Sequence, residues 1–67
     1  MKVRINGREE MLPDSVTTLQ ELVVNQGLAP ERIVAEVNLQ VIPCENWPTV
    51  SLRDEDSIEI VSFVGGG

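Results

Sequence analysis

The sequence has 67 residues, with eleven acidic, five basic and no histidine side chains, and a net charge of −6. A chain this short forms one domain, residues 1–67, and has little room for a deep cleft with a full catalytic set. The acidic balance disfavours nucleic-acid binding, which needs clustered Lys and Arg, and favours partners with basic surfaces. We therefore expect a protein on which other proteins act.

A β-hairpin is predicted at the start of the chain. Apolar and charged residues alternate over residues 3–5, as in a half-buried strand. Asn6 and Gly7 follow, and both tolerate the positive φ of a type I′ turn, so residues 8–12 are predicted to form the return strand. A two-residue loop would place Glu10 on the inward face of the hairpin, so we expect a bulge or a longer loop.

One helix is predicted at residues 19–26. Thr18 is the expected N-cap, and Glu21 three residues later completes a capping box. Gly27 supplies a left-handed stop. The apolar positions follow helical spacing on one face, and they are Leu19, Leu22 and Val23.

The second half of the chain is predicted to contain further strands. They lie at residues 33–37, 41–42 and 57–64, with a short edge strand at 49–52. The acidic run at residues 54–56 is expected to be a solvated turn. On the last strand, Ile58 and Ile60 face one side, and Val61 and Phe63 face the other. The side chains expected to be most buried are Leu19, Leu22, Val23, Ile5, Val37, Ile58 and Ile60.

This order of elements predicts an α+β fold in which a mixed sheet of four to five strands packs on one main helix. The first and last strands are expected to be parallel neighbours at the centre of the sheet. Trp47 is expected in the small core or at its rim.

Cys44 is the only cysteine. A single thiol forms no intramolecular disulfide and supplies no cysteine-rich metal cluster, and this usage fits a reducing cytoplasm. No histidine or second cysteine is near it in sequence to activate it, so we expect it to pack or to lie on the surface. The sequence contains no apolar run of membrane-spanning length, and its first ten residues do not resemble a signal peptide.

The sequence ends in Phe63, Val64, Gly65, Gly66 and Gly67. Three glycines at a terminus commonly form only a frayed end. Here they directly follow a strong strand, and a glycine arm can pass a narrow channel and deliver a carboxylate into another protein. The last four residues reach about 13 Å when extended. We expect residues 65–67 to make few contacts with the domain.

The sequence resembles the sulfur carrier family of thiamine biosynthesis, the ThiS family, along essentially its whole length. The matching segments are VRINGRE, TTLQELVVNQG, VAEVNLQVIP and the ending IEIVSFVGGG, with Trp47 before the ending. The resemblance implies a ubiquitin-like β-grasp fold. Two positions depart from the family pattern, because Leu39 and Glu55 stand where glycine is common, and a non-glycine residue with positive φ is strained.

The resemblance also implies a carrier acted on by enzymes, with no catalytic residue, metal site or cofactor of its own. A ubiquitin-activating-like adenylyltransferase would use ATP to adenylate the carboxylate of Gly67. A sulfur donor protein would convert the adenylate to a thiocarboxylate, which thiazole synthase would consume. Gly65 and Gly66 would thread into the partners, while Phe63 and Val64 would seat the arm in partner grooves or, alternatively, only pack in the strand.

Two other functions remain open from the sequence. The small subunit of molybdopterin synthase also delivers sulfur from a terminal glycine carboxylate. A ubiquitin-like modifier, or a plain interaction domain, is the alternative from another class. A ferredoxin-type β-grasp is excluded, because the four cysteines of an iron–sulfur cluster are absent.

Overall fold

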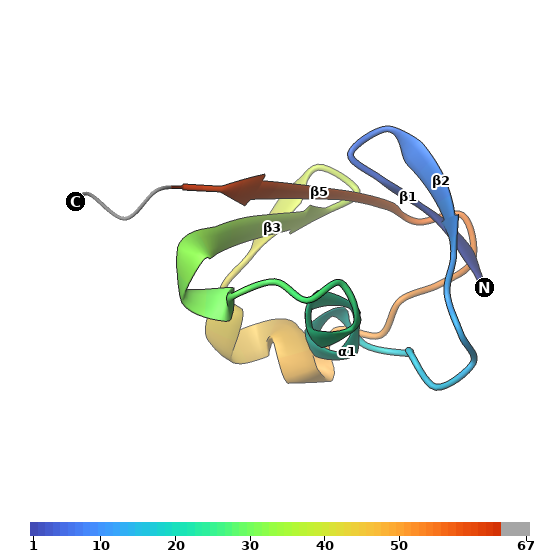
Figure 1. Cartoon of the computed structure of the whole chain (residues 1–67), viewed down its shortest axis with the longest axis horizontal. Coiled ribbons are helices and arrows are strands. Elements are labelled where there is room, and N and C mark those ends of the chain that lie inside the picture. Colours follow the sequence, from blue (N-terminus) through green and yellow to red (C-terminus); the bar gives the residue numbers. More distant parts are fainter. Residues whose placement is uncertain (64–67) are drawn as a thin grey trace.

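The computed structural model describes residues 1–63, which form a five-stranded sheet covered on one face by a helix (Figure 1). The four residues after Phe63 lie outside the described part of the chain. The elements are β1 (Lys2–Ile5), β2 (Arg8–Met11), α1 (Leu19–Asn25), β3 (Ile33–Val37), β4 (Gln40–Ile42) and β5 (Ser57–Ser62), with short 3-10 helices η1 (Pro30–Arg32) and η2 (Cys44–Thr49).

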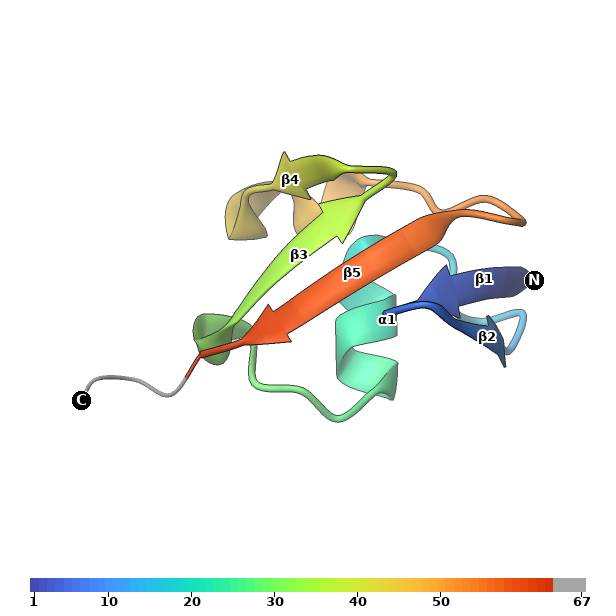
Figure 2. The ribbon, with the colours of Figure 1, turned by 90° about the horizontal axis from the view of Figure 1, so that it is seen from above.

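The strand order is β2-β1-β5-β3-β4, so the last strand lies at the centre of the sheet. β5 runs parallel to β1 and antiparallel to β3, with Ile5 beside Ile58 and Ala35 beside Ile60. This is the mixed α+β arrangement predicted from the sequence, with β1 and β5 as parallel neighbours. Figure 2 shows β5 crossing the middle of the molecule toward the C-terminal end.

The first hairpin has the predicted turn without the predicted bulge. Asn6 (φ 52°) and Gly7 (φ 81°) both have positive φ, and Val3 lies directly opposite Glu10 in regular antiparallel register. The expectation of a bulge or a longer loop was therefore wrong. β2 is an edge strand, so Glu10 on its inward side remains partly exposed and its carboxylate keeps access to water.

The helix begins and ends where its capping residues predict. The Thr18 side chain accepts a hydrogen bond from the Glu21 backbone N–H at 3.1 Å, and the Glu21 carboxylate accepts one from the Thr18 backbone N–H at 3.0 Å. This capping box satisfies donors that the first turn leaves unpaired. Gln26 is the C-cap, and Gly27 follows with a φ of 71°.

Residues 44–52 differ from the prediction of a short edge strand at 49–52. Residues 44–49 form the 3-10 helix η2, and only Ser51 makes a single β-bridge, to Thr18. The reason is Trp47, which η2 directs into the core, where 1% of its surface is exposed and its indole N–H donates to the Ile42 carbonyl at 2.9 Å. Proline at position 48 within this segment also lacks the backbone N–H that a strand ladder requires.

The core lies between the sheet and the layer of α1 and η2. Six of the seven side chains predicted to be most buried are buried, and Val37 is only partly buried against the same core. Sequence reasoning did not place Leu12, Val16, Ile33, Ala35 and Leu52 in this core.

Candidate functional site

The candidate site lies at the end of β5, where the chain leaves the sheet. Phe63 follows β5 directly, and its backbone N–H donates to the Arg32 carbonyl at 2.9 Å, which continues the pairing with the chain preceding β3. Its side chain is 48% exposed. The other predicted site residues lie outside the described residues, and they are Val64, Gly65, Gly66 and Gly67.

Exposed apolar side chains gather on the outward face of the sheet near this end. Val34 on β3 lies directly opposite Val61 on β5, and Val61 is 58% exposed. Val41 on β4 and Phe63 point to the same face, since residues two apart on a strand share a face. We call Val34, Val41, Val61 and Phe63 the outer apolar cluster.

Acidic residues border this cluster. Glu36 of β3 and Glu59 of β5 lie opposite one another on the outward face, and Glu36 also lies opposite Val41. Like charges directly opposite one another on a sheet destabilise the pair slightly. The outward face thus combines apolar surface with negative charge, an arrangement that is complementary to a basic and apolar partner surface.

The two positions that depart from the family pattern, Leu39 and Glu55, have left-handed backbone although neither is glycine. Leu39 has a φ of 71° and Glu55 a φ of 73°, and Leu39 is 88% exposed. Asn38 holds the two turns together, because its side chain donates to the Asp56 carboxylate at 2.9 Å and accepts from the Ser57 N–H at 3.0 Å. These bonds compensate for the strain of a non-glycine residue in this region.

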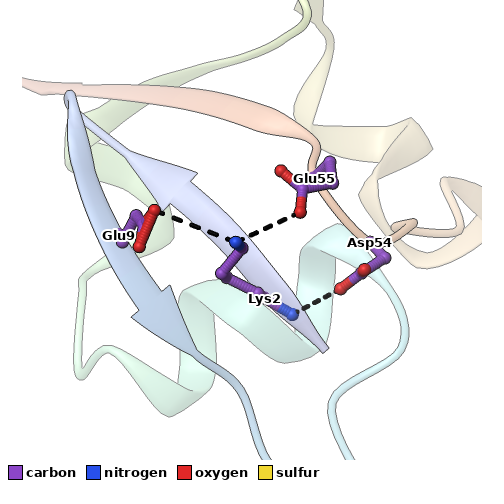
Figure 3. A network of polar contacts seen from close by, with 4 residues as sticks. All are labelled: Lys2, Glu9, Asp54 and Glu55. Atoms are coloured by element: carbon purple, nitrogen blue, oxygen red, sulfur yellow. Dashed lines mark hydrogen bonds and ion pairs between the residues drawn. The ribbon is translucent and has the colours of Figure 1, made fainter.

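The acidic run at residues 54–56 is the solvated turn predicted from the sequence, and a hydrogen bond and an ion pair connect it to β1. The Asp54 carboxylate accepts from the Lys2 backbone N–H at 2.7 Å, and the Lys2 ammonium lies 3.3 Å from Glu55 and 3.9 Å from Glu9 (Figure 3). The hydrogen bond to Glu55 and its charge, followed by the charge of Glu9, raise the pKa of Lys2. The pairs are solvent-exposed, so each contributes little to stability.

The remaining candidate residues have structural positions. Cys44 is exposed on η2, at the surface position that was one of its two expected environments. Among the described residues, no group of three acidic, histidine or cysteine side chains is placed to hold a metal ion. Within residues 1–63, no helix is both long and apolar enough to cross a membrane.

Comparisons with known proteins agree with this geometry. The sequence profile of the ThiS family matches residues 2–67. Over 65 residues the chain is 35% identical to the sulfur carrier protein ThiS of Bacillus subtilis, a match that covers 97% of this chain and 98% of that protein. The crystal structure of the thiamine biosynthesis protein ThiS from Geobacter metallireducens is similar with a TM-score of 0.82 and 27% identity, over 100% of both chains.

A longer relative contains a similar sequence as one part of its length. Over 67 residues the chain is 39% identical to the thiazole synthase of Magnetococcus marinus, and the match covers 100% of this chain and 20% of that protein. The chain thus spans about a fifth of the length of this relative. The family profile matches nearly every residue, a short relative is similar over nearly its whole length, and a solved ThiS structure has the same fold. The chain therefore belongs to the ThiS family.

Proposed function

We propose that this protein is a sulfur carrier of thiamine biosynthesis. The observation that carries the proposal is the similarity to the Bacillus subtilis sulfur carrier, which extends over 98% of that protein. The fold supports it, because β5 is the central strand and leads directly into the glycine-rich ending. Family membership favours this function over a molybdopterin-synthase subunit or a ubiquitin-like modifier.

The chemistry takes place at the carboxylate of Gly67. A carboxylate oxygen attacks the α-phosphorus of ATP, pyrophosphate leaves, and an acyl adenylate forms. A sulfur nucleophile at the oxidation level of sulfide then attacks the acyl carbon, and AMP leaves with the electron pair of the broken C–O bond. The product is a thiocarboxylate. The carrier supplies only the reacting carboxylate, while the partner enzyme supplies the nucleotide site and the catalytic groups.

Three partners follow from this chemistry. An ATP-dependent adenylyltransferase activates Gly67, a sulfur donor protein provides the sulfur, and thiazole synthase accepts it. The thiazole synthase of Magnetococcus marinus supports the last assignment, since it contains sequence similar to this chain within its own length. Because the activation consumes ATP and the single thiol fits a reducing compartment, we place the protein in the cytoplasm.

The outer apolar cluster is the surface we assign to partner contact. Phe63 is nearest to the glycine arm, and Val61 lies beside it on the same face. Apolar and aromatic side chains that desolvate on contact commonly dominate the energy of an interface. Phe63 and Val64 would fix the start of the arm, and Gly65 and Gly66 would let the backbone approach the nucleotide closely.

Intact-mass spectrometry tests the proposal directly. The protein is incubated with ATP, the adenylyltransferase and a sulfide source, and its mass is compared with that of the untreated protein. We expect the exchange of one oxygen for one sulfur, located at Gly67 by fragmentation. The untreated protein should carry a free Gly67 carboxylate. A sulfur located elsewhere, or a mass that does not change, would contradict the proposal.

Three variants test whether the reaction depends on the carboxylate of Gly67 and not on another group of the protein. Deleting Gly67 shortens the reach by about 3.5 Å, and a misplacement of about 1 Å can already reduce a rate on the order of a hundredfold. One residue added after Gly67 places the reacting group in a peptide bond and should abolish pyrophosphate exchange. Cys44→Ser should retain normal exchange, because Cys44 has no role in the mechanism.

A further inference from the structure

The end of β5 has a backbone neighbour on one side only. β1 ends at Ile5, and its pairing with β5 stops at Ile58. Figure 2 shows β1 beside the first part of β5, while β3 continues along it toward the C-terminal end. From Ile60 onward the backbone of β5 is therefore paired to β3 on one side, and the turn that ends β1 leaves the other side without a strand. A strand end with one neighbour bends and frays more readily than a strand paired on both sides.

The side chain of Asn6 takes the place of the missing strand. The Asn6 backbone N–H donates to the Ile58 carbonyl at 2.8 Å, as the last bond of the parallel ladder. Its carboxamide then continues the ladder by one step, because Oδ1 accepts from the Ile60 N–H at 2.7 Å and Nδ2 donates to the Ile60 carbonyl at 3.1 Å. A carboxamide carries the same donor and acceptor as a peptide group, and here it satisfies both backbone groups of Ile60.

The structure contains a matched counterpart at the other end of β5. Asn38 begins the second hairpin turn with a φ of 51°, against 52° for Asn6. Its backbone N–H also donates to a β5 carbonyl, that of Ser57, at 2.7 Å. Its carboxamide also makes two hydrogen bonds, to the Ser57 N–H and to Asp56. The two asparagines therefore share backbone geometry and the number of side-chain hydrogen bonds. They differ in which end of β5 they hold and in the acceptor of the amide N–H, which is the Ile60 carbonyl for Asn6 and the Asp56 carboxylate for Asn38.

We infer that Asn6 is a positioning residue for carrier activation. Its carboxamide fixes the direction in which the end of β5 leads the chain out of the sheet, and so the approach of the Gly67 carboxylate to the activating enzyme. This inference rests on the proposed function. Neither asparagine bears the reacting group. A comparison of variants at the two positions therefore isolates the effect of holding the C-terminal end of β5.

The size of the effect follows from the geometry. Residues 64–67 reach about 13 Å when extended, so the region that the Gly67 carboxylate can search is centred on the end of β5 and shifts when the strand end shifts. The partner can still bind and orient a misdirected arm, at a cost in the free energy of association. Loss of the Asn6 carboxamide should therefore lower kcat/KM for adenylation by roughly tenfold through KM, while kcat changes by less than about twofold.

The test compares Asn6→Gly with Asn38→Gly. Glycine accepts the positive φ at both sites, so both turns persist and each variant loses two side-chain hydrogen bonds. The readouts are amide hydrogen exchange of the carrier alone and pyrophosphate exchange with the adenylyltransferase over a range of carrier concentrations. In Asn6→Gly we expect faster amide exchange at Ile60 and Phe63 and the roughly tenfold lower kcat/KM. In Asn38→Gly we expect faster amide exchange at Ser57 and an unchanged kcat/KM.

The wild-type rate separates this inference from the proposed function. If the wild-type protein supports no pyrophosphate exchange, the proposed function fails and the role of Asn6 fails with it. If the wild-type protein is active and the two variants have equal kcat/KM, only the role of Asn6 is overturned. Equal Phe63 amide exchange in the wild type and in Asn6→Gly would also overturn it, since the strand end would then be held without the carboxamide.

Discussion

The two faces of the sheet carry similar apolar side chains in different surroundings. On β5, Ile58 and Ile60 face the helix layer and are buried, while Val61 on β5 and Phe63 just after it face outward and remain about half exposed. α1 and η2 cover the inner face, and within residues 1–63 no helix lies over the outer one (Figure 1). Apolar side chains on the inner face thus have a role in folding that those on the outer face lack.

The difference in burial separates the residues that we assign to folding from those that we assign to partner contact. A buried side chain gains roughly 25 cal/mol for each Å² of apolar surface removed from water, and the outer apolar cluster forgoes much of that gain in the free protein. In the function proposed above, contact with a partner would supply the missing burial. The inner face should therefore govern stability, and the outer face should govern activation.

Leu22→Ala should have the largest effect on stability. Leu22 is fully buried on α1, so truncation leaves a cavity and should lower the free energy of unfolding by about 2–4 kcal/mol. The matched control is Val24→Ala on the same helix, where the side chain is 64% exposed and the loss should stay within about 0.5 kcal/mol. Urea unfolding with unchanged m-values measures both. Equal losses in the two variants would contradict the assignment of the inner face.

Trp47→Phe tests the part of the core that η2 contributes. The substitution removes the indole N–H that donates to the Ile42 carbonyl and also reduces the buried volume. We expect a loss of about 1–3 kcal/mol, from the unmade hydrogen bond and the smaller side chain. The midpoint of urea unfolding reports it. An unchanged midpoint would mean that the indole adds nothing beyond a phenyl ring.

Much of this architecture could be predicted from the sequence because local chemistry specifies it. The capping box of Thr18 and Glu21 located the start of α1, and Asn6 and Gly7 located the first turn. Alternating apolar residues correctly assigned the two faces of β5. Each of these signals depends on residues within a few positions of one another.

The errors arose where tertiary contacts override the local pattern. Residues 49–52 have strand-like composition, but burial of Trp47 from η2 fixes the preceding segment as a 3-10 helix. Glu10 was expected to force a bulge, yet its position on an outermost strand leaves its carboxylate accessible to water. Neither the depth of the core nor the order of strands is encoded at short range.

The site could be predicted only in part, for a similar reason. The glycine-rich ending and the outward position of Phe63 follow from the sequence. The contacts of Asn6 with Ile60 join residues 54 positions apart, and those of Asn38 join residues 18 and 19 apart. No sequence motif marks such a contact, although an Asn at the first position of each turn could have drawn attention to it.

Val61→Thr addresses the outer face. Threonine has nearly the same shape as valine, and the site is largely exposed, so the free energy of unfolding should change by less than about 0.5 kcal/mol. If a partner covers the outer apolar cluster, the hydroxyl is buried without a hydrogen bond, and kcat/KM for adenylation should fall about fivefold. Val24→Thr, an exposed valine away from this face, is the control and should alter neither quantity. Unchanged adenylation of Val61→Thr would remove the outer face from the partner interface.

Glu21→Gln should have the smallest effect and should be visible only in acid. Hydrogen bonds from the Thr17 backbone and hydroxyl, followed by that from the Thr18 backbone, lower the pKa of Glu21 in the folded protein. A carboxyl whose folded pKa lies below its unfolded pKa contributes stability above the unfolded pKa and loses it as the pH falls through the folded one.

The stability that the Glu21 charge contributes at the exposed start of α1 is therefore lost in acid, whereas the uncharged glutamine has no such dependence on pH. A glutamine amide oxygen can accept the same bonds, so Glu21→Gln should differ little from wild type in acid and be slightly less stable at neutral pH. The difference should shrink as the pH falls below about 4, where the unfolded carboxyl becomes protonated. Thermal midpoints at pH 3 and pH 7 measure it. A gap between the two proteins that is as large at pH 3 as at pH 7 would show that the Glu21 charge is not its source.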